Sequence, residues 1–394
     1  MDVQSVTGVV AATSYIGPTV RQGARMKPSV IYPAILLALT LGACDDGDGG
    51  DPRDAGASDG ATQTAGGDGD GDGDGDGDGG GDGDGDGDGD GDGDGDGDGD
   101  GDGSPVGLAV DLSNPMLHEF ELDPAQLDPA VTDSLDPQYA QLDTRVAPLG
   151  KLVFFLSGST NVPRNWRDHG RQLAGYGFHV VIPHYNNRWS ANGNPCAGVG
   201  GSCGDDTRWE ALTGEDASSV IEISRADSAE GRAIKMLEYL VGTHPGGDWG
   251  YYLDADGGLR GQDVIIAGIS HGATNSGLFA SRRAFHRSVM HSGGYWSIGG
   301  SPATPIAEFY GLSHTDDGQH QGHLDSWQSG GLLGMPTSID GAAPPYGDSR
   351  QLITSQPNGY PHCSVAVSGE SPVDGQGNYM FDQAWRTMYG VAEL

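Results

Sequence analysis

Four short apolar runs stand out in the chain beyond residue 150, and small or polar residues follow each of them. They cover residues 151–156, 178–182, 263–267 and 287–291. A run that is apolar on both faces is typical of a buried parallel strand, whereas a half-exposed strand alternates. The pattern therefore predicts four buried strands.

Helical spacing fills the intervals between these runs. One segment covers 166–174, and a longer amphipathic one runs from Ser218 to Val241, with the apolar positions 233, 234, 237, 240 and 241 on one helical face. Two further strands are predicted over 306–314 and 349–355. Strands that alternate with helices of this length predict an α/β domain, with a mostly parallel central sheet and helices on both faces.

The composition is far from uniform. The chain holds 70 glycines and has a formal net charge of -36, and a near-continuous Gly-Asp repeat between Cys44 and Ser104 supplies most of that charge. Glycine buries nothing and the carboxylates repel one another, so this tract is expected to be a disordered, solvated linker. Calcium binding is the alternative, but the tract lacks the glutamate of an EF-hand loop and the apolar residue of calcium-binding nonapeptide repeats.

The N-terminal region has the features of an export signal. An apolar run over 35–41 follows Lys27, and Leu41-Gly-Ala-Cys44 resembles the bacterial lipobox, in which the cysteine is lipidated. We therefore expect a signal region over 1–43 with its true start at Met26, a lipidated Cys44 heading a linker over 44–104, and a folded domain over 105–394. An ordinary signal peptide is the alternative.

The charge pattern excludes some classes of protein. The chain has only 20 Lys and Arg residues in total and no basic cluster, which excludes nucleic-acid binding. Only one apolar run exceeds ten residues, which excludes a multi-span membrane protein. We expect a monomer that is exported and held by lipid at the bacterial outer membrane, on its periplasmic side or at the cell surface.

The predicted strand over 263–267 leads directly into Gly268-Ile-Ser270-His-Gly272, and helix-compatible residues follow. A serine on such a sharp strand-to-helix turn is held in a strained backbone conformation, and the residues two before and two after it must be small. Gly268 and Gly272 meet that requirement. The segment resembles the nucleophile turn of the α/β-hydrolase superfamily, and the resemblance covers the chain from Lys151 to about Tyr389.

That resemblance implies a serine hydrolase in which the chain order is serine, acid, histidine. Downstream of Ser270, His362 follows the last predicted strand and is the base candidate. Asp317 follows the strand before it and is the acid candidate, with Asp316 as the alternative. The two acid–base loops would leave neighbouring strands at the same sheet edge.

An oxyanion needs two N–H donors. The backbone of His271 would supply one of them. The loop after the first predicted strand, Ser157-Gly-Ser-Thr160, would supply the other, and we favour Ser159 over Thr160.

The remaining cysteines and histidines allow further predictions. Cys196 and Cys203 bracket a glycine-rich loop and are expected to form a disulfide in an exported protein, which leaves Cys363 unpaired. The connection 185–209 is long for a strand–helix link and is either a roof over the site or a plain surface insertion. Several histidines surround Asp316 and Asp317, but no spaced ligand pair fixes a metal, so neither a metal nor another cofactor is expected. The other clustered histidines are His314, His320 and His323.

Together these features predict a membrane-anchored, exported serine hydrolase that cleaves carboxylic esters, in small molecules or polymers, through an acyl-enzyme. Two alternatives remain at this point. One is a non-catalytic surface-binding module on a hydrolase fold, because fold does not fix function. The other is a serine peptidase, which uses the same three residues.

Overall fold

The computed structural model describes residues 108–190 and 195–394. Predictions that concern residues 1–43, Cys44 or the Gly-Asp tract lie outside these ranges. The described strands are β1 (Leu117–Leu122), β2 (Gln138–Asp143), β3 (Leu152–Leu156), β4 (His179–Ile182), β5 (Val264–Ile269), β6 (Arg287–His291), β7 (Phe309–His314), β8 (Thr337–Ser338) and β9 (Gln351–Thr354).

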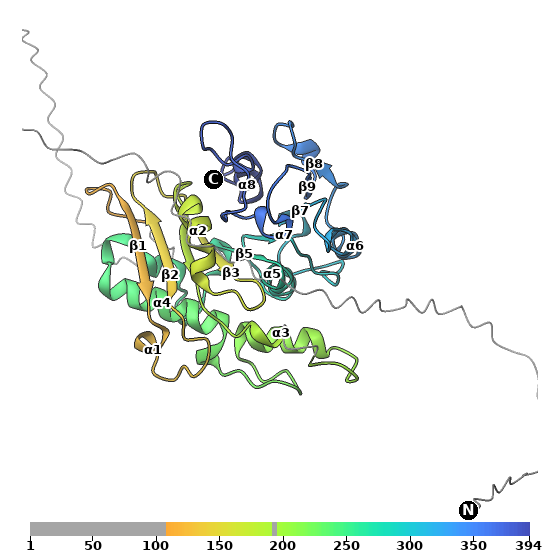
Figure 1. The fold of residues 1–394 in the computed structure, drawn as a ribbon. Coiled ribbons are helices and arrows are strands. Elements are labelled where there is room, and N and C mark those ends of the chain that lie inside the picture. Colours follow the sequence, from red (N-terminus) through yellow and green to blue (C-terminus); the bar gives the residue numbers. More distant parts are fainter. Residues whose placement is uncertain (1–107, 191–194) are drawn as a thin grey trace, which may run out of the picture. The chain divides into compact units, whose positions relative to one another are not determined.

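These strands form one sheet in the order β1-β2-β4-β3-β5-β6-β7-β9-β8 (Figure 1). From β4 through β8, neighbouring strands are parallel. At the other edge β1 pairs antiparallel with β2, and β2 pairs antiparallel with β4. The predicted α/β class with a mostly parallel sheet is confirmed.

Helices lie against the sheet and around its carboxyl edge (Figure 1). The α-helices are α1 (Pro124–Leu127), α2 (Arg167–Ala174), α3 (Cys203–Thr213), α4 (Ala229–Thr243), α5 (His271–Arg282), α6 (His320–Gly330), α7 (Pro361–Ser364) and α8 (Asp382–Met388). Short 3-10 turns cover Pro163–Trp166, Arg188–Ser190, Arg225–Asp227, Pro245–Gly247, Trp249–Tyr252, Gly261–Asp263, Ile306–Glu308 and Tyr346–Asp348. None of the described helices combines the length and the apolarity that a membrane span requires.

The central strands alternate their side chains between two buried layers. On β3, Phe154 faces the core that α4 and α5 cover, whereas Val153 and Phe155 face the core that α2 and α8 cover. Every residue of β3 and of β5 is buried. Burial on both sides explains why these strands read as continuous apolar runs in the sequence.

Two predicted elements begin later in the structure than the sequence pattern suggests. The amphipathic stretch from Ser218 is not one helix: α4 begins at Ala229, where the Ser228 hydroxyl accepts the N–H of Gly231 at 3.1 Å and caps the helix. Residues 218–223 are irregular because the Glu210 carboxylate accepts backbone N–H groups there. The strand expected from 306 begins at Phe309, after a 3-10 turn.

The antiparallel strands β1 and β2 were not expected. β1 carries Glu119 and Glu121, and its burial pattern alternates, so it lacks the apolar run that marks the central strands. Like charges and polar residues at a sheet edge are typical of a strand protected against pairing with other chains.

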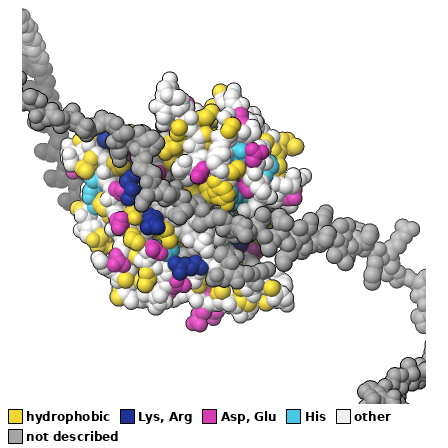
Figure 2. Space-filling view, viewed as in Figure 1, with side chains coloured by type: hydrophobic (Ala, Val, Ile, Leu, Met, Phe, Trp, Pro, Cys, Tyr) yellow, Lys and Arg dark blue, Asp and Glu magenta, His cyan; other side chains and the backbone are white. Residues whose placement is uncertain are grey.

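Figure 2 shows the surface of this domain in the same view. Lys and Arg side chains lie among Asp and Glu side chains on this face and do not form a continuous basic patch. On the part of this face that the described residues form, positive and negative side chains are therefore mixed.

Candidate active site

Ser270 sits on a tight turn between β5 and α5, with φ 56° and ψ -119°. This left-handed backbone conformation is costly for a residue with a side chain and is held only by its surroundings. The flanking glycines make the turn possible. A Cβ on Gly272 would lie 2.1 Å from the Leu156 carbonyl oxygen, and one on Gly268 would lie 2.5 Å from the Gly272 carbonyl carbon.

The parallel register brings the loops that follow three strands to one edge of the sheet. Ile269 on β5 pairs with His291 on β6, which in turn pairs with Leu312 on β7. Further along β7, His314 pairs with Thr354 of β9. Because parallel strands share their carboxyl edge, the loops with Ser270, Asp317 and His362 all leave from it.

Asp317 and His362 form a buried pair. The His362 Nδ1 and Asp317 Oδ2 atoms are 2.7 Å apart, and the two side chains are 7% and 3% exposed. Burial alone would raise the pKa of Asp317, but hydrogen bonds from His362 and from the Gln319 N–H outweigh it and lower that pKa. Asp317 is thus a carboxylate that fixes the proton of His362 on Nδ1.

The other ring nitrogen of His362 is unoccupied within the described part of the chain. Its Nε2 atom is buried and makes no hydrogen bond there. With Nδ1 protonated, Nε2 is an acceptor. This is the state in which an imidazole can take a proton from a hydroxyl.

Asp316, the alternative acid, is exposed. Its backbone N–H donates to the His314 Nδ1 atom at 3.0 Å, and the His314 Nε2 atom bonds the Gln356 carbonyl at 2.7 Å. His314 therefore ties the two acid–base loops together. The structure pairs His362 with Asp317 and leaves Asp316 outside the buried pair.

A second histidine, His323 on α6, lies beside this pair. Its Nδ1 atom is 3.9 Å from the Asp317 carboxylate and 2.9 Å from the Ser313 hydroxyl. Burial lowers the pKa of His323 to about 4, so it is neutral at physiological pH. The sequence showed His323 as one of several clustered histidines, but nothing in the sequence separated it from the others.

His323, Asp317 and His362 are also the group in the described ranges that could hold a metal ion. One ligand atom from each lies within 4.8 Å of the others. Asp and His are common zinc ligands. A metal on these atoms would replace the hydrogen bond that fixes His362, so the metal and acid–base roles compete.

The predicted oxyanion donors lie on both sides of Ser270. His271 is the first residue of α5, where backbone N–H groups have no partner within the helix. The loop after β3 approaches from the other side, because a Cβ on Gly158 would lie 3.4 Å from the Ser270 Cβ. Ser159 follows in that loop, and its role as a donor stays a prediction.

Residues of the long connection after β4 hold this loop in place. The Asn187 side-chain amide donates to the Gly158 carbonyl at 2.7 Å, and the Tyr185 hydroxyl donates to the Ser157 carbonyl at 3.1 Å. Asn275 of α5 donates in turn to Tyr185 at 3.1 Å. The described part of the connection is therefore packed against the nucleophile turn, a role that the sequence left open.

The cysteines differ in part from expectation. Cys196 and Cys203 are disulfide-bonded, and the bond ties the connection to the first turn of α3. The prediction of an unpaired Cys363 is wrong, because Cys363 is disulfide-bonded as well. The sequence offered no pairing rule for it beyond the short spacing of the other two.

A buried network holds the segment that follows His362. The segment 365–367 donates a backbone N–H to His169 Nδ1 and accepts a hydrogen bond from His291 Nδ1. Because its Nδ1 accepts, His169 carries its proton on Nε2 and donates it to the Tyr389 hydroxyl at 3.1 Å. Because its Nδ1 donates, His291 accepts on Nε2 the proton of that hydroxyl, also at 3.1 Å. Every member is satisfied, and the network fixes the backbone just beyond the base.

No protein-family model matches the chain, and no curated protein matches its sequence. Solved structures do match. Serine hydrolase F of Staphylococcus aureus, a fluorophosphonate-binding enzyme solved with substrate bound, is 13% identical, with 71% of this chain and 98% of that chain covered and a TM-score of 0.34. An acetyl xylan esterase from Aspergillus awamori is 12% identical, with 70% and 99% covered and a TM-score of 0.33.

Esterase 2 of Thermogutta terrifontis, solved with butyrate bound, is 10% identical, with 72% of this chain and 93% of that chain covered and a TM-score of 0.32. Likenesses at this level carry no argument about activity. The function of this chain is therefore argued from the geometry of Ser270, Asp317 and His362.

Proposed function

We propose that the domain is a serine hydrolase that cleaves carboxylic esters through an acyl-enzyme. The observation that carries the proposal is the buried Asp317–His362 pair, which leaves His362 Nε2 as an unoccupied acceptor at the sheet edge where Ser270 stands on a strained turn. A hydroxyl nucleophile needs such a base, and the base needs such a carboxylate.

The first half-reaction forms a bond from the Ser270 oxygen to the ester carbonyl carbon while His362 Nε2 takes the hydroxyl proton. The His271 N–H and a donor from the loop after β3 stabilise the carbonyl oxygen as it becomes negative. The bond to the alcohol oxygen then breaks, and His362 returns the proton to the leaving alcohol. Water repeats the sequence, attacks the acyl carbon and releases the acid and Ser270.

The test is hydrolysis of p-nitrophenyl acetate and butyrate by the purified protein and by Ser270→Ala. We expect turnover by the wild type and a loss of about 10³- to 10⁶-fold in kcat for the variant, because the nucleophile is gone. Ser276→Ala is the matched control, since this hydroxyl lies on the same helix and bonds backbone carbonyls. Equal rates for Ser270→Ala and wild type would overturn the assignment, and no turnover by a folded wild type would favour a binding module.

The delivery of the enzyme is proposed on the sequence alone. The lipobox-like residues Leu41–Cys44 support an exported protein with a lipid on the Cys44 sulfur. A lipid on the Cys44 sulfur and a disulfide at Cys44 exclude each other, and Cys44 is the one cysteine of the sequence besides the disulfide-bonded Cys196, Cys203 and Cys363. Mass spectrometry of the Cys44 peptide from membranes should show diacylglycerol, and a peptide linked through Cys44 to another cysteine would contradict the proposal.

A further inference from the structure

The charged side chain of Arg208 on α3 hydrogen-bonds to two neutral side chains. One of its terminal nitrogens, Nη1, donates to His271 Nδ1 at 3.0 Å and to the Asn275 side-chain oxygen at 2.7 Å. Within the described ranges, no carboxylate oxygen lies within ion-pair distance of its guanidinium. The fully buried arginines Arg232 and Arg287 are paired: Arg232 lies 2.8 Å from Asp227, and Arg287 lies 2.7 Å from Glu308.

The position of Arg208 is costly for a cation. Loss of water around the guanidinium lowers the pKa of Arg208 to about 10, so the group is still charged at neutral pH. The side chain nevertheless keeps some accessible surface. A retained charge in a desolvated place normally has a counter-charge in contact with it. The Asp205 carboxylate raises the pKa of Arg208 through space, but it accepts the hydrogen bond of the Tyr295 hydroxyl and lies 3.8 Å from Arg282.

His271 adds an unmatched donor. Because Arg208 donates to Nδ1, the neutral imidazole must carry its proton on Nε2. Burial, and then the Arg208 charge, hold the pKa of His271 well below its usual value, so the ring stays neutral. The side chain is only 6% exposed, and its Nε2 finds no acceptor among the described residues.

Trp189 contributes a third donor of the same kind. Its ring meets that of His271 edge-on at 4.8 Å between centroids, and the Arg208 guanidinium carbon lies 5.4 Å from the indole centroid. The indole Nε1 is buried and has no acceptor in the described part of the chain. Three neighbouring side chains thus offer only donors, and a ligand that satisfies them must supply acceptors.

We propose that Arg208 binds a carboxylate of the substrate, and that His271 and Trp189 donate to other acceptor atoms of the same molecule, so that the preferred esters carry an acidic group. This inference rests on the proposed function, because a substrate carboxylate is relevant here only if the neighbouring Ser270 is the nucleophile. His271 directly follows Ser270, and consecutive Cα atoms are about 3.8 Å apart, so the anion and the scissile bond fit within one small molecule. The planar guanidinium fork also matches a carboxylate.

The first experiment compares two esters in wild type and Arg208→Gln. The substrates are the p-nitrophenyl hemiester of adipic acid and its methyl ester, in which a methyl ester replaces the negatively charged carboxylate; release of p-nitrophenol reports only the shared aryl ester. The formal net charge of -36 repels anions, so a preference for the acid ester cannot come from general attraction. We expect the wild type to favour the acid ester in kcat/KM and Arg208→Gln to lower the ratio of the two values about 10- to 100-fold.

Two further variants guard this experiment. Arg208→Lys keeps the charge but loses the fork, and should give an intermediate ratio; it also carries the test if Arg208→Gln does not fold. Arg188→Gln removes an exposed charge from the same connection as Trp189 and should leave the ratio unchanged. Ratios that are equal in wild type, Arg208→Lys and Arg208→Gln would overturn the proposal.

The second experiment measures binding without catalysis. Adipate should raise the melting temperature of Ser270→Ala, and the rise should vanish in the Ser270→Ala, Arg208→Gln double variant. Binding of adipate without any ester hydrolysis by the wild type would remove the proposed function and keep the anion site. Hydrolysis without adipate binding and without an Arg208-dependent ratio would remove the anion site and keep the function.

Discussion

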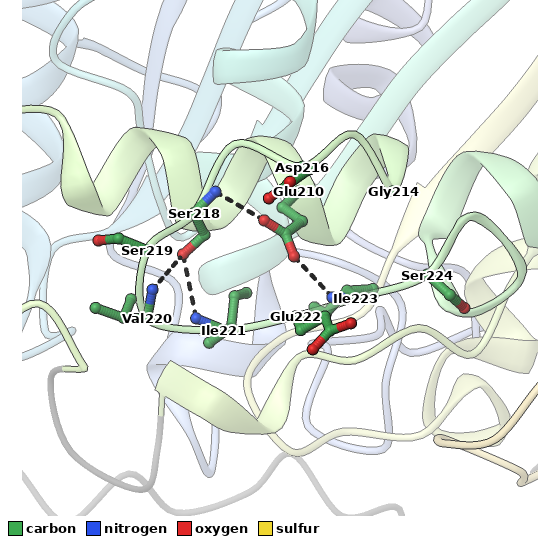
Figure 3. A pocket seen from close by; sticks show the side chains of 10 residues that line it. All are labelled: Glu210, Gly214, Asp216, Ser218, Ser219, Val220, Ile221, Glu222, Ile223 and Ser224. Carbon is green, nitrogen blue, oxygen red and sulfur yellow. Dashed lines mark hydrogen bonds between the residues drawn. The ribbon is translucent and has the colours of Figure 1, made fainter.

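Two charged residues of helix α3, Arg208 and Glu210, lie two positions apart in the sequence, and their surroundings differ. The Glu210 carboxylate accepts the N–H of Ser218 on one oxygen and that of Ile223 on the other (Figure 3). The first oxygen also accepts the N–H of Ala217. Arg208, on the side of the nucleophile turn, donates to neutral acceptors among the described residues. A charge matched on every side holds structure together, whereas an unmatched one is available to a ligand.

The same contrast explains why the hollow beside Glu210 is not the site. Its volume is about 730 Å³, and Figure 3 shows its lining. The Glu210 oxygens already point at backbone N–H groups of the loop over 214–224, and the Ser218 hydroxyl accepts from Val220 and Ile221. The Glu210 carboxylate and the Ser218 hydroxyl in this hollow therefore already hydrogen-bond to the backbone of the loop that lines it.

The imidazole ring of His362 has one nitrogen with a partner and one nitrogen without a partner among the described residues. His362 Nδ1 is matched by Asp317, and Nε2 is left open. Changing Asp317 to Asn should place the imidazole in the wrong tautomer and lower kcat by about 10⁴-fold. Asp316→Asn is the control and should cost roughly 1 kcal/mol or less, the scale of one loop hydrogen bond. Steady-state kinetics on p-nitrophenyl butyrate decide, and the reverse ranking would move the acid by one residue.

Glu210→Ala tests the structural side of the comparison. Its loss would leave three backbone N–H groups of the loop without their acceptor, so we expect unfolding to become easier by about 2–4 kcal/mol. Glu222→Ala removes an exposed carboxylate from the same loop and should change stability little. Chemical denaturation of both variants measures this. Equal stabilities would mean that the Glu210 contacts contribute nothing net.

Buried histidines should make the fold sensitive to mild acid. Burial lowers the pKa of His179 and His184 to about 4 and that of His291 to about 3, whereas the unfolded chain titrates near 6.5. Below pH 6.5 these histidines are protonated in the unfolded chain but stay neutral in the folded one. The free energy of unfolding therefore falls as the pH drops, by up to about 1.4 kcal/mol per pH unit for each histidine.

The window from pH 6.5 to 5 isolates this effect, because Asp and Glu remain largely ionised in both states there. The lowered pKa of Asp317 affects stability at lower pH. Its stabilising contribution is complete above the pKa that the residue has in the unfolded chain, and it is lost as the pH falls through the lower pKa of the folded state. Denaturant titrations at several pH values measure the slope. A flat profile from pH 6.5 to 5 would show that the histidines do not oppose protonation.

The smallest expected effect is that of a chelator. If Asp317 and His362 work as a hydrogen-bonded pair, prolonged treatment with EDTA should leave the ester hydrolysis rate unchanged. A loss of activity that zinc restores would instead assign Asp317, His323 and His362 to a metal.

Local features of the sequence predicted the site's core, and long-range contacts supplied the rest. Ser270 could be found because the glycines that its turn requires are adjacent to it, and Asp317 and His362 because parallel strands end at one edge. Arg208 could not be found, since its contact with His271 spans 63 residues and depends on how α3 packs on α5. The edge strand β1 was missed because its half-exposed pattern lacks a continuous apolar run.

The central claim is that Ser270 is a nucleophile activated by His362. The most direct measurement is labelling of the folded protein with an alkyl p-nitrophenyl phosphonate, followed by peptide mass spectrometry. We predict one p-nitrophenol released per chain and one adduct on Ser270, with labelling abolished in His362→Ala. An adduct on another residue, or a folded protein that reacts no faster than its denatured form, would contradict the account.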